Sequence, residues 1–441
     1  MVYLLYLQPK GRYSSGQREQ TVNLLHTRFA GSNPALPIKK INTMKNKKIS
    51  LSVYLLFSFI YWNQGIWGLR ASPLFYLMRE DWGLNVANIA LIGCITTIPW
   101  TIKPLWGIII DSFPLFKKKT KYWLILNYTI ISILSLTIWI FGLNYWTLII
   151  TGFIFGICFS WNDVAGDGFV CVLEKKYNLS GKLQAISWFS LSLAGLVTSL
   201  GGAWIAKYHN YKLAFLLCAI SPLIMIYFIC TKHQEPDVEP KKLDIPQLKL
   251  FWKALFNKTL AIPMAFLFCF FLSPSFGTPL MVQMREALHM DKMMIGFLGS
   301  VGTVFGLIGY LLYFFKLYKF NLTKLLYFSV TFGAFSTLWY LYIPNQWWLL
   351  GYNVILGTVG AISHLVILAY VAKITPKGYE ALVFAGLCSV LNLGSMGSGY
   401  IGGLLYDYIG FNWLVIISAM FTLCCLFFIP HLNLKKTGEY R

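Results

Sequence analysis

The chain has 441 residues, of which 57% are hydrophobic, 17% aromatic and only 12% charged. A soluble domain carries about 25% charged residues, so the polar side chains here are too few to cover a water-soluble protein of this length. Disordered chains combine low hydrophobicity with high charge, and this composition excludes them. The net charge of +21 does not require nucleic acid as a partner, and a membrane protein with many spans is the class that remains.

Twelve apolar runs follow one another, each near the length of about 20 residues that crosses a bilayer as a helix. A polar segment divides them six and six. We predict an all-α fold with two six-helix bundles, residues 50–231 and 257–431, a linker 232–256 and a tail 432–441. The predicted spans are 50–77, 85–110, 122–142, 146–172, 183–206, 212–231, 257–281, 292–315, 323–343, 346–372, 380–405 and 411–431.

Most of the 37 Lys and Arg residues fall on the side of the membrane that holds the linker and both termini. Positive charge is retained in the cytoplasm, so this distribution predicts that both termini are cytoplasmic. Residues 1–49 form a basic leader, which suits a transit peptide. The alternative is a misplaced gene start, because residues 31–34 (Gly-Ser-Asn-Pro) match the reading frame of a common transfer-RNA arm, and the true start is then Met44.

The two halves share a local pattern, since residues 200–202 (Leu-Gly-Gly) and 401–403 (Ile-Gly-Gly) each close a predicted span. With the six-plus-six spacing, this predicts a duplicated six-helix unit, as in major facilitator transporters. No phosphate-binding loop, metalloprotease motif or channel filter motif occurs, which argues against an ATP-driven pump, a metal-dependent enzyme and a channel. The nine cysteines lie in apolar runs and are interpreted as free thiols, and His364 as a hydrogen-bonded structural residue.

Four charged residues lie well inside predicted spans, where a charge costs about 2.5–3.5 kcal/mol on insertion scales. They are Arg70, Lys103, Asp163 and Asp167. Asp163 and Asp167 share one helix face, which Glu174 extends toward the cytoplasm. Inside a membrane, the carboxylates of this acidic face must be hydrated, paired with a positive charge or protonated. A buried ion pair of this face with Lys103 is the structural interpretation, and it does not exclude a function.

Depth in the bilayer separates Arg70 from the other three charges. At 1.5 Å per residue, Lys103, Asp163 and Asp167 lie roughly 8, 6 and 12 Å inward of their helix centres, so they can meet. Arg70 lies roughly 10 Å outward. We interpret Arg70 as the group that meets an anionic substrate, because guanidinium binds carboxylates in a planar, bidentate way. The alternative is that Arg70 snorkels to the outer interface.

Polar and aromatic side chains near the bilayer centre are the candidates for holding a flat ligand. Asn63 and Gln64 carry amides at the middle of the first span, and they either bind a heteroaromatic ring or join helices. Trp161 and Trp188 either stack on such a ring or pack in the core.

The loop after the second span carries Gly107, Asp111 four residues later, and then a cluster of lysines. This arrangement is typical of the cytoplasmic loop of major facilitators. We expect Asp111 to hold an inner gate closed by a charge-assisted hydrogen bond and to release it when the halves rock.

Residues 99–107 (Pro-Trp-Thr-Ile-Lys-Pro-Leu-Trp-Gly), residues 111–114 (Asp-Ser-Phe-Pro) and the acidic element 162–168 resemble the folate-biopterin transporter family of major facilitators. Residues 65–70 and 376–394 resemble it too, in the same order along the chain. The resemblance implies secondary transport of folates, pterins or related molecules such as S-adenosylmethionine. It implies substrate or coupling roles for Arg70, Lys103, Asp163 and Asp167. Asn162 departs from the small polar residue expected there, which leaves the substrate open.

We therefore expect a monomeric transporter of the cell or inner membrane that takes up folate- or pterin-type substrates with a coupling proton by alternating access. Asp163 or Asp167 would carry the proton, because burial disfavours a charged carboxylate. No enzyme activity, cofactor, metal or nucleic-acid partner is expected. The first alternative is a transporter of S-adenosylmethionine or another nucleotide-like molecule, anchored by Asp163. The second is a membrane receptor or assembly protein that transports nothing.

Overall fold

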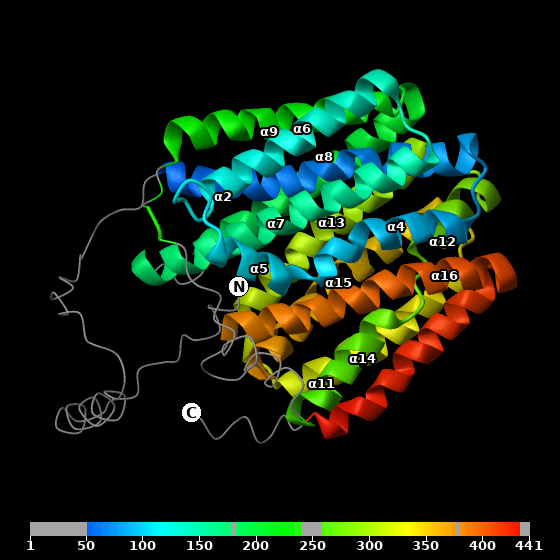
Figure 1. Cartoon of the computed structure of the whole chain (residues 1–441). Coiled ribbons are helices and arrows are strands. Elements are labelled where there is room, and N and C mark those ends of the chain that lie inside the picture. The colour runs from blue at the N-terminus through cyan, green and yellow to red at the C-terminus, as the bar shows by residue number, and fades with distance from the viewer. Residues whose placement is uncertain are drawn as a thin grey trace, which may run out of the picture.

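The computed structural model describes residues 51–177, 182–233, 235, 237–239, 258–374 and 380–432, and within these ranges it contains helices and no β-strand. The predicted leader and most of the predicted linker and tail lie outside the described residues. Figure 1 shows long helices lying side by side, with the turns between them gathered at two opposite ends.

The helices of the first half follow the predicted spans closely. The first span is a chain of shorter segments, the second is bent, and the remaining four are single helices. These are α2 (Leu51–Ile66), η2 (Trp67–Arg70), α3 (Ala71–Tyr76), η3 (Leu77–Asp81), α4 (Val86–Thr101), α5 (Lys103–Ser112), α6 (Lys121–Phe141), α7 (Tyr145–Tyr177), α8 (Lys182–Tyr208) and α9 (Lys212–Lys232).

The second half repeats this design. Its first span is again segmented, and its last two predicted spans run together as one element with a non-helical residue, Gly410, between them. The elements are α11 (Lys258–Leu272), α12 (Gly277–Val282), η4 (Gln283–Ala287), α13 (Lys292–Phe315), η5 (Leu317–Lys319), α14 (Leu322–Thr337), η6 (Leu338–Leu341), α15 (Gln346–Ile374), α16 (Glu380–Cys424) and η7 (Cys425–His431).

Among the described residues, eight helices are long and apolar enough to cross a membrane, or nine if α4 and α5, bent by 42°, form one span. The predicted twelve differ from this count for local reasons. The stretch Ala385–His431 contains two predicted spans divided at Gly410. The predicted spans 50–77 and 323–343 are broken into shorter helical segments, so no single helix in them is long enough.

Helix packing divides the described chain into two groups. In the first, α8 packs on α2, α9 on α6, and α7 on α4; in the second, α15 packs on α13, and α16 on α11 and α14. The groups meet where α8 packs on α13 and α4 on α16. The two most extensive contacts between the groups therefore join the second or fifth span of one half to the fifth or second span of the other.

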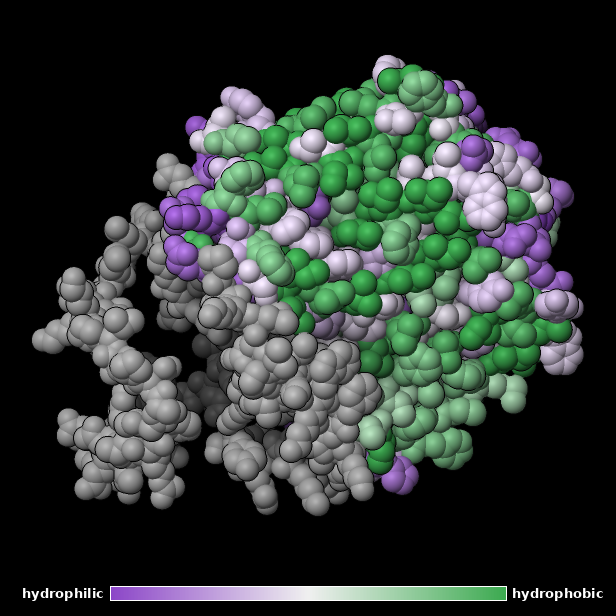
Figure 2. Space-filling model, in the orientation of Figure 1, coloured by the Kyte–Doolittle hydropathy of each residue, from purple (hydrophilic) through white to green (hydrophobic). Residues whose placement is uncertain are grey.

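The outer surface of this bundle is suited to lipid. Figure 2 shows apolar residues over the middle of one face and hydrophilic residues toward both ends of the helices. On the peripheral helices α6 and α9, large apolar side chains are exposed, with Ile133 at 57% and Ile224 at 52%. Water would disfavour such a surface and a bilayer would not, in agreement with a polytopic membrane protein.

The paired glycines have a structural reason. A Cβ atom on Gly202 would lie 2.9 Å from the carbonyl oxygen of Leu69 in the first span, and one on Gly402 would collide with the carbonyl oxygen of Ser275 in the seventh. Helices can approach this closely only when the side chain is absent. By these contacts Gly202 corresponds to Gly402, an offset of 402 − 202 = 200 residues. The sequence pattern pairs residues 200–202 with 401–403, an offset of 401 − 200 = 201 residues.

Candidate functional site

Two prolines bend the second span and position Lys103 at the bend. Pro99 lies inside α4, and Pro104 has no N–H to donate to the carbonyl of Trp100 four residues earlier. That carbonyl instead accepts a hydrogen bond of 2.9 Å from Nδ2 of Asn392 in α16. The side chain of Trp106 donates to the carbonyl of Pro99 at 2.9 Å. The bend is therefore stabilised by the opposite half of the molecule, beside Lys103.

Lys103 forms a buried ion pair with Asp163 of α7. Its Nζ lies 2.6 Å from Oδ2 of Asp163, and the two side chains are 19% and 9% exposed. The ammonium also lies 4.7 Å from the centroid of the Trp100 ring, within the range of a cation–π contact. The predicted ion pair of Lys103 with the acidic face is confirmed, and the structure shows that Asp163 is the partner. The pair is neutral as a whole, which lowers the cost of placing both charges inside the bundle.

Asp167 lies one turn further along α7 and accepts a hydrogen bond from the hydroxyl of Tyr61 in α2. Tyr61 is 2% exposed, so this bond is made in the interior of the first half. Lys103 is already paired with Asp163, which leaves Asp167 as the carboxylate without a full opposite charge in direct contact. Tyr61 was not among the residues expected from sequence. It is 106 positions away from Asp167, and no local pattern announces the pairing. The side chain of Glu174 lies outside the described residues.

Arg70 is placed apart from this cluster. Its guanidinium lies over the Trp67 ring, 4.4 Å from the centroid, and its Nε is buried without a hydrogen-bond partner. The Trp67 ring packs on Phe155 and Phe159 of α7, at 4.2 and 5.1 Å between centroids. The expected separation of Arg70 from the carboxylates therefore holds. Among the described residues no ion pair neutralises it.

The two amides of the first span are placed differently. Asn63 is 1% exposed, donates from Nδ2 to the carbonyl of Phe59 at 2.8 Å, and keeps a buried Oδ1 without a partner. Gln64 is half-buried. In this conformation Asn63 lies inside the bundle, so a ligand reaches its free oxygen only if the packing around it opens.

The two candidate tryptophans have different surroundings. Trp161 is 8% exposed and stacks between Trp106 and Trp123, with centroids 5.0 and 4.4 Å away. It forms part of an aromatic core inside the first half. Trp188 of α8 is half-buried and lies 6.3 Å from His364 of the second half. Trp188 therefore reaches the boundary between the two halves, and Trp161 does not.

The predicted gating residues lie in α5 at the linker end, and not in the loop where the sequence pattern places them. Asp111 forms an ion pair with Lys119 of the loop between α5 and α6. A Cβ on Gly107 would meet Val164 at an ordinary contact distance of 3.6 Å.

The same loop binds the described part of the linker. The Glu235 carboxylate accepts hydrogen bonds from the backbone N–H groups of Thr120 and Lys121, at 3.0 and 2.8 Å. The Nζ of Lys121 donates to the carbonyl of His233 at 2.9 Å. Burial would raise the pKa of the Glu235 carboxyl, but hydrogen bonds from His233, Lys121 and Thr120 outweigh it and hold the pKa below its ordinary value.

Ion pairs join the two halves at the opposite end of the helices, where η3 and η4 lie. Arg79 binds Glu286 through Nε and Nη2 at 2.6 and 2.9 Å. Arg285 binds Glu80 at 2.9 Å, and Lys292 binds the other oxygen of Glu80 at 2.6 Å. These pairs link the two halves at this end of the helices. Sequence reasoning missed them, although the segments 78–80 and 284–286 are both Met-Arg-Glu.

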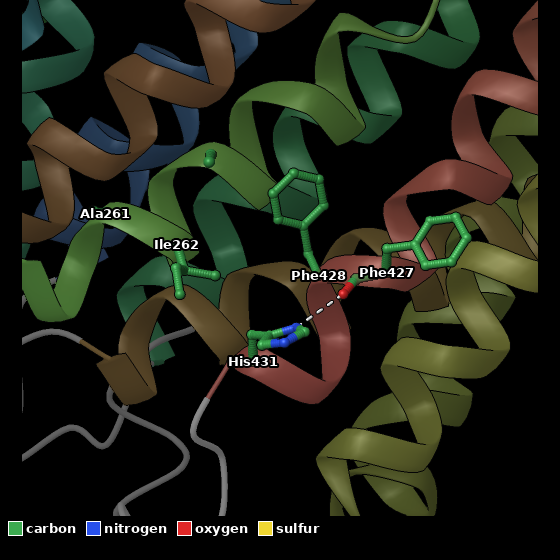
Figure 3. A pocket seen from close by; sticks show the side chains of 6 residues that line it. Ala261, Ile262, Phe427, Phe428 and His431 are labelled. Atoms are coloured by element: carbon green, nitrogen blue, oxygen red, sulfur yellow. Dashed lines mark hydrogen bonds between the residues drawn. The ribbon is translucent and has the colours of Figure 1, made fainter.

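Two hollows stand out. One, of about 440 Å³, lies between the start of α11 and η7 (Figure 3) and is lined by apolar side chains and by His431, whose Nδ1 lies 3.1 Å from the carbonyl oxygen of Phe427. It offers almost nothing polar to a charged or heteroaromatic ligand. The other, also about 440 Å³, lies between α8, α13 and α15 and is lined by glycines together with Ser192, Tyr310 and His364.

His364 differs from its interpretation as a hydrogen-bonded structural residue. It makes no hydrogen bond with the described part of the chain, and its neighbours are the rings of Trp188 and Tyr310, at 6.3 and 6.5 Å between centroids. Among the described residues, no group of three or more His, Cys, Asp or Glu side chains could hold a metal ion.

Solved structures with similar folds are transporters. A mutant form of the nucleoside transporter NupG superposes with a TM-score of 0.70 at 14% identity, covering 86% of this chain and all of the other. A D-xylose-proton symporter gives a TM-score of 0.68 at 13% identity over 88% of this chain and 98% of the other. At such low identity they show the fold alone, which is the all-α major facilitator fold.

Related sequences identify the family, which the similar folds do not. The folate-biopterin transporter of Synechocystis is 27% identical over 86% of this chain and 81% of its own length. Folate transporter 1 of Plasmodium falciparum is 23% identical over 86% of this chain and 79% of its own. Residues 64–435 match the BT1 family. The chain therefore belongs to the BT1 family, which is a family of membrane transporters and not of enzymes, as its resemblance to the folate-biopterin transporters implies.

Proposed function

We propose that this protein transports a folate- or pterin-type substrate across a membrane by alternating access, coupled to a proton and in the direction of uptake. The observation that carries the proposal is the charged cluster of Lys103, Asp163 and Asp167, inside the first half and beside the second. A charged side chain inside the membrane costs free energy, and such residues typically bind or move a substrate or an ion. The names of the related folate transporters supply the substrate class.

Asp167 is the better proton carrier of the two carboxylates. Lys103 neutralises Asp163 directly, so protonating Asp163 would strand a buried ammonium. Asp167 is held by a neutral hydroxyl, and a proton on it removes the remaining charge of the cluster. Movement of the substrate past this cluster is then favoured when Asp167 is protonated.

Arg70 supplies the attraction for an anion. Its guanidinium lacks an ion-pair partner in the described chain, and a carboxylate of folate would provide one. Since Arg70 lies apart from Lys103, we propose that it acts on entry of the substrate and that the cluster acts later. Asn63, Gln64 and the face of Trp188 would hold the flat ring, and Trp161 would back the cluster from the core.

The ion pairs between η3 and η4 are the proposed outer gate, and Gly107 and Asp111 belong to the proposed inner gate. This orientation puts both termini in the cytoplasm, by the positive-inside rule. We propose a monomer in the cell membrane or inner membrane.

The direct test is transport by the purified full chain in liposomes, with labelled folate, biopterin or S-adenosylmethionine offered separately. Accumulation of folate or biopterin that follows an inward proton gradient supports the proposal. Accumulation of S-adenosylmethionine alone would replace the substrate and make Asp163 and Asp167 its anchor. If none of the three exchanges across the membrane, the transport proposal is wrong for these substrates, and a receptor or assembly function becomes the better explanation.

A further inference from the structure

The cavity between α8, α13 and α15 has the size and walls of a binding site. Its volume of about 440 Å³ falls within the range of about 300–1,000 Å³ that small-molecule sites occupy. Five glycines of α13 and α15 line it, so its floor is backbone without side chains. Two of them, Gly302 and Gly357, also let α13 and α15 touch. Gly360 has no atom within 4 Å of the place where a Cβ would lie, so there the space is open.

From this cavity we infer a subsite that binds a flat heteroaromatic ring against the glycine floor, between Ser192 of the first half and His364 and Tyr310 of the second. Trp188 does not line the cavity but lies behind His364, 6.3 Å from its ring. The inference rests on the proposed function, and adds second-half residues to the groups that would hold the bicyclic ring of a pterin. None of these second-half residues is predicted from the motifs that carry the resemblance.

Two of the three rings line the cavity, and His364 lies between the other two. The centroid of His364 lies 6.3 Å from that of Trp188 and 6.5 Å from that of Tyr310, with the planes inclined by 64° and 54°. Aromatic pairs interact over about 4.5–7 Å, so these rings contact one another edge-on or at a tilt and not in a parallel stack. A planar ligand over the glycine floor would meet the rings of His364 and Tyr310 at the side of the cavity.

Polar atoms surround the same space. The hydroxyls of Ser192 and Tyr310 line the cavity, and the His364 imidazole has no hydrogen-bond partner in the described chain. A neutral imidazole offers one donor and one acceptor, and each hydroxyl offers both. Bicyclic heteroaromatic rings carry alternating nitrogen donors and acceptors along their edges. This set of groups therefore suits such a ring better than it suits a sugar or an aliphatic chain.

A chain of rings links the cavity to the charged cluster. His364 lines the cavity and lies 6.3 Å from Trp188, Trp188 lies 6.4 Å from the Tyr61 ring, and the Tyr61 hydroxyl donates to Asp167. A ligand that shifts His364 would therefore act, through Trp188, on the residue that holds the proposed proton carrier. Because Ser192 and His364 belong to opposite halves, the ligand would also touch both bodies that move in alternating access.

The test fills the cavity with a leucine side chain and compares this variant with a control that carries the same substitution outside the cavity. Gly360→Leu places a side chain in the cavity, whereas Gly351→Leu places the same side chain in open space elsewhere on α15. Equilibrium binding of biopterin, folate and S-adenosylmethionine would be measured for the wild-type full chain and both variants. We expect Gly360→Leu to weaken binding at least tenfold, Gly351→Leu to leave it unchanged, and both to melt at the wild-type temperature without ligand. His364→Phe, which keeps a ring but removes its nitrogens, should weaken binding several-fold.

The outcomes separate the subsite from the proposed function. If Gly360→Leu binds both ligands as the wild type does, the subsite is wrong and the transport proposal stands. If the wild type binds only S-adenosylmethionine, whose adenine is also a flat heteroaromatic ring, the substrate proposal fails. A tenfold loss of that binding in Gly360→Leu alone then still supports the subsite. Binding of none of the three ligands by the wild type contradicts both.

Discussion

Arg79 and Glu286 form a bidentate ion pair between the two halves, with hydrogen bonds of 2.6 and 2.9 Å from Nε and Nη2. The pair has a counterpart in which the types are exchanged, since Arg285 binds Glu80 at 2.9 Å. Each arginine therefore crosses to the acid that follows the other arginine in sequence. Such a reciprocal pair is what a two-fold relation between the halves produces.

The backbone around these residues repeats as well. Met-Arg-Glu lies on a π-helical turn in both η3 and η4, at positions 206 apart (285 − 79). The Nη1 atoms of Arg79 and Arg285 donate to the carbonyls of Leu84 and Met290, which are again 206 apart. The duplication that the glycine pairs indicate therefore extends to the groups that close one end of the molecule.

Exchanging the charges tests the proposed outer gate. Arg79→Glu should disfavour the closed end, and Arg79→Glu with Glu286→Arg should restore it, because the second change returns an opposite pair. Partly exposed pairs contribute up to about 1 kcal/mol each, so we expect a shift of up to about fivefold in the open-to-closed ratio. Distances between spin labels at the η3 and η4 ends would report it. The reciprocal exchange at Arg285 and Glu80 is the control, and a double exchange that fails to restore closure contradicts the gate.

Removing one member of the buried pair should be costly. Lys103→Ala strands the Asp163 carboxylate, and loss of one partner of a buried pair typically costs about 3–5 kcal/mol. Thermal unfolding in detergent should show this loss. Lys103→Met together with Asp163→Leu removes both charges and should recover most of the stability, while transport stays absent. A stable Lys103→Ala variant would show that the pair is hydrated and contributes little.

Asp167→Asn keeps the shape of the carboxylate but takes up no proton. We expect this variant to bind substrate and to exchange it across liposomes, yet to lose accumulation driven by a proton gradient. Tyr61→Phe removes the hydrogen bond to Asp167 and should shift the pH dependence of transport without abolishing it. Full pH-dependent accumulation by Asp167→Asn would remove Asp167 from the coupling role.

Arg70→Ala removes the proposed attraction for the substrate carboxylates. A ligand present at 100 times its Kd adds about 2.7 kcal/mol of apparent stability, which thermal unfolding detects. We expect folate to stabilise the wild type and not Arg70→Ala, whereas biopterin, which has no carboxylate, should stabilise both. Equal stabilisation of both proteins by folate would mean that Arg70 has a packing role over Trp67.

Glu235 should make stability depend on pH at the cytoplasmic loop. Its folded pKa lies below the ordinary value of 4.5, so its contribution is complete above about pH 4.5 and is lost as the pH falls through the folded pKa. Hydrogen bonds to a charged group contribute about 1.5–3 kcal/mol, so Glu235→Gln should lower stability near pH 7 and approach the wild type in acid. Melting temperatures across pH would show this. Asp237→Asn, an exposed partner of Lys118, is the control and should change nothing measurable.

The sequence by itself determined the membrane class and the helix positions. Uninterrupted apolar runs must cross a bilayer as helices, because backbone groups have no other partner there. The bounds of α6, α9 and α13 lie within one residue of the predicted spans for that reason. The Lys103–Asp163 pair was also predictable, since two opposite charges at similar depth in neighbouring helices cost less together than apart.

Only the tertiary structure decided which polar groups meet across long sequence distances. Tyr61 reaches Asp167, Asn392 reaches the carbonyl that Pro104 leaves free, and Trp188 reaches His364. None of these partners lies on the same helix, so helical spacing carries no information about them. The Tyr61–Asp167 contact depends on how helices pack within the first half, and the other two depend on how the two halves meet. Both are set by the summed packing of many apolar contacts and glycine approaches, not by any one motif.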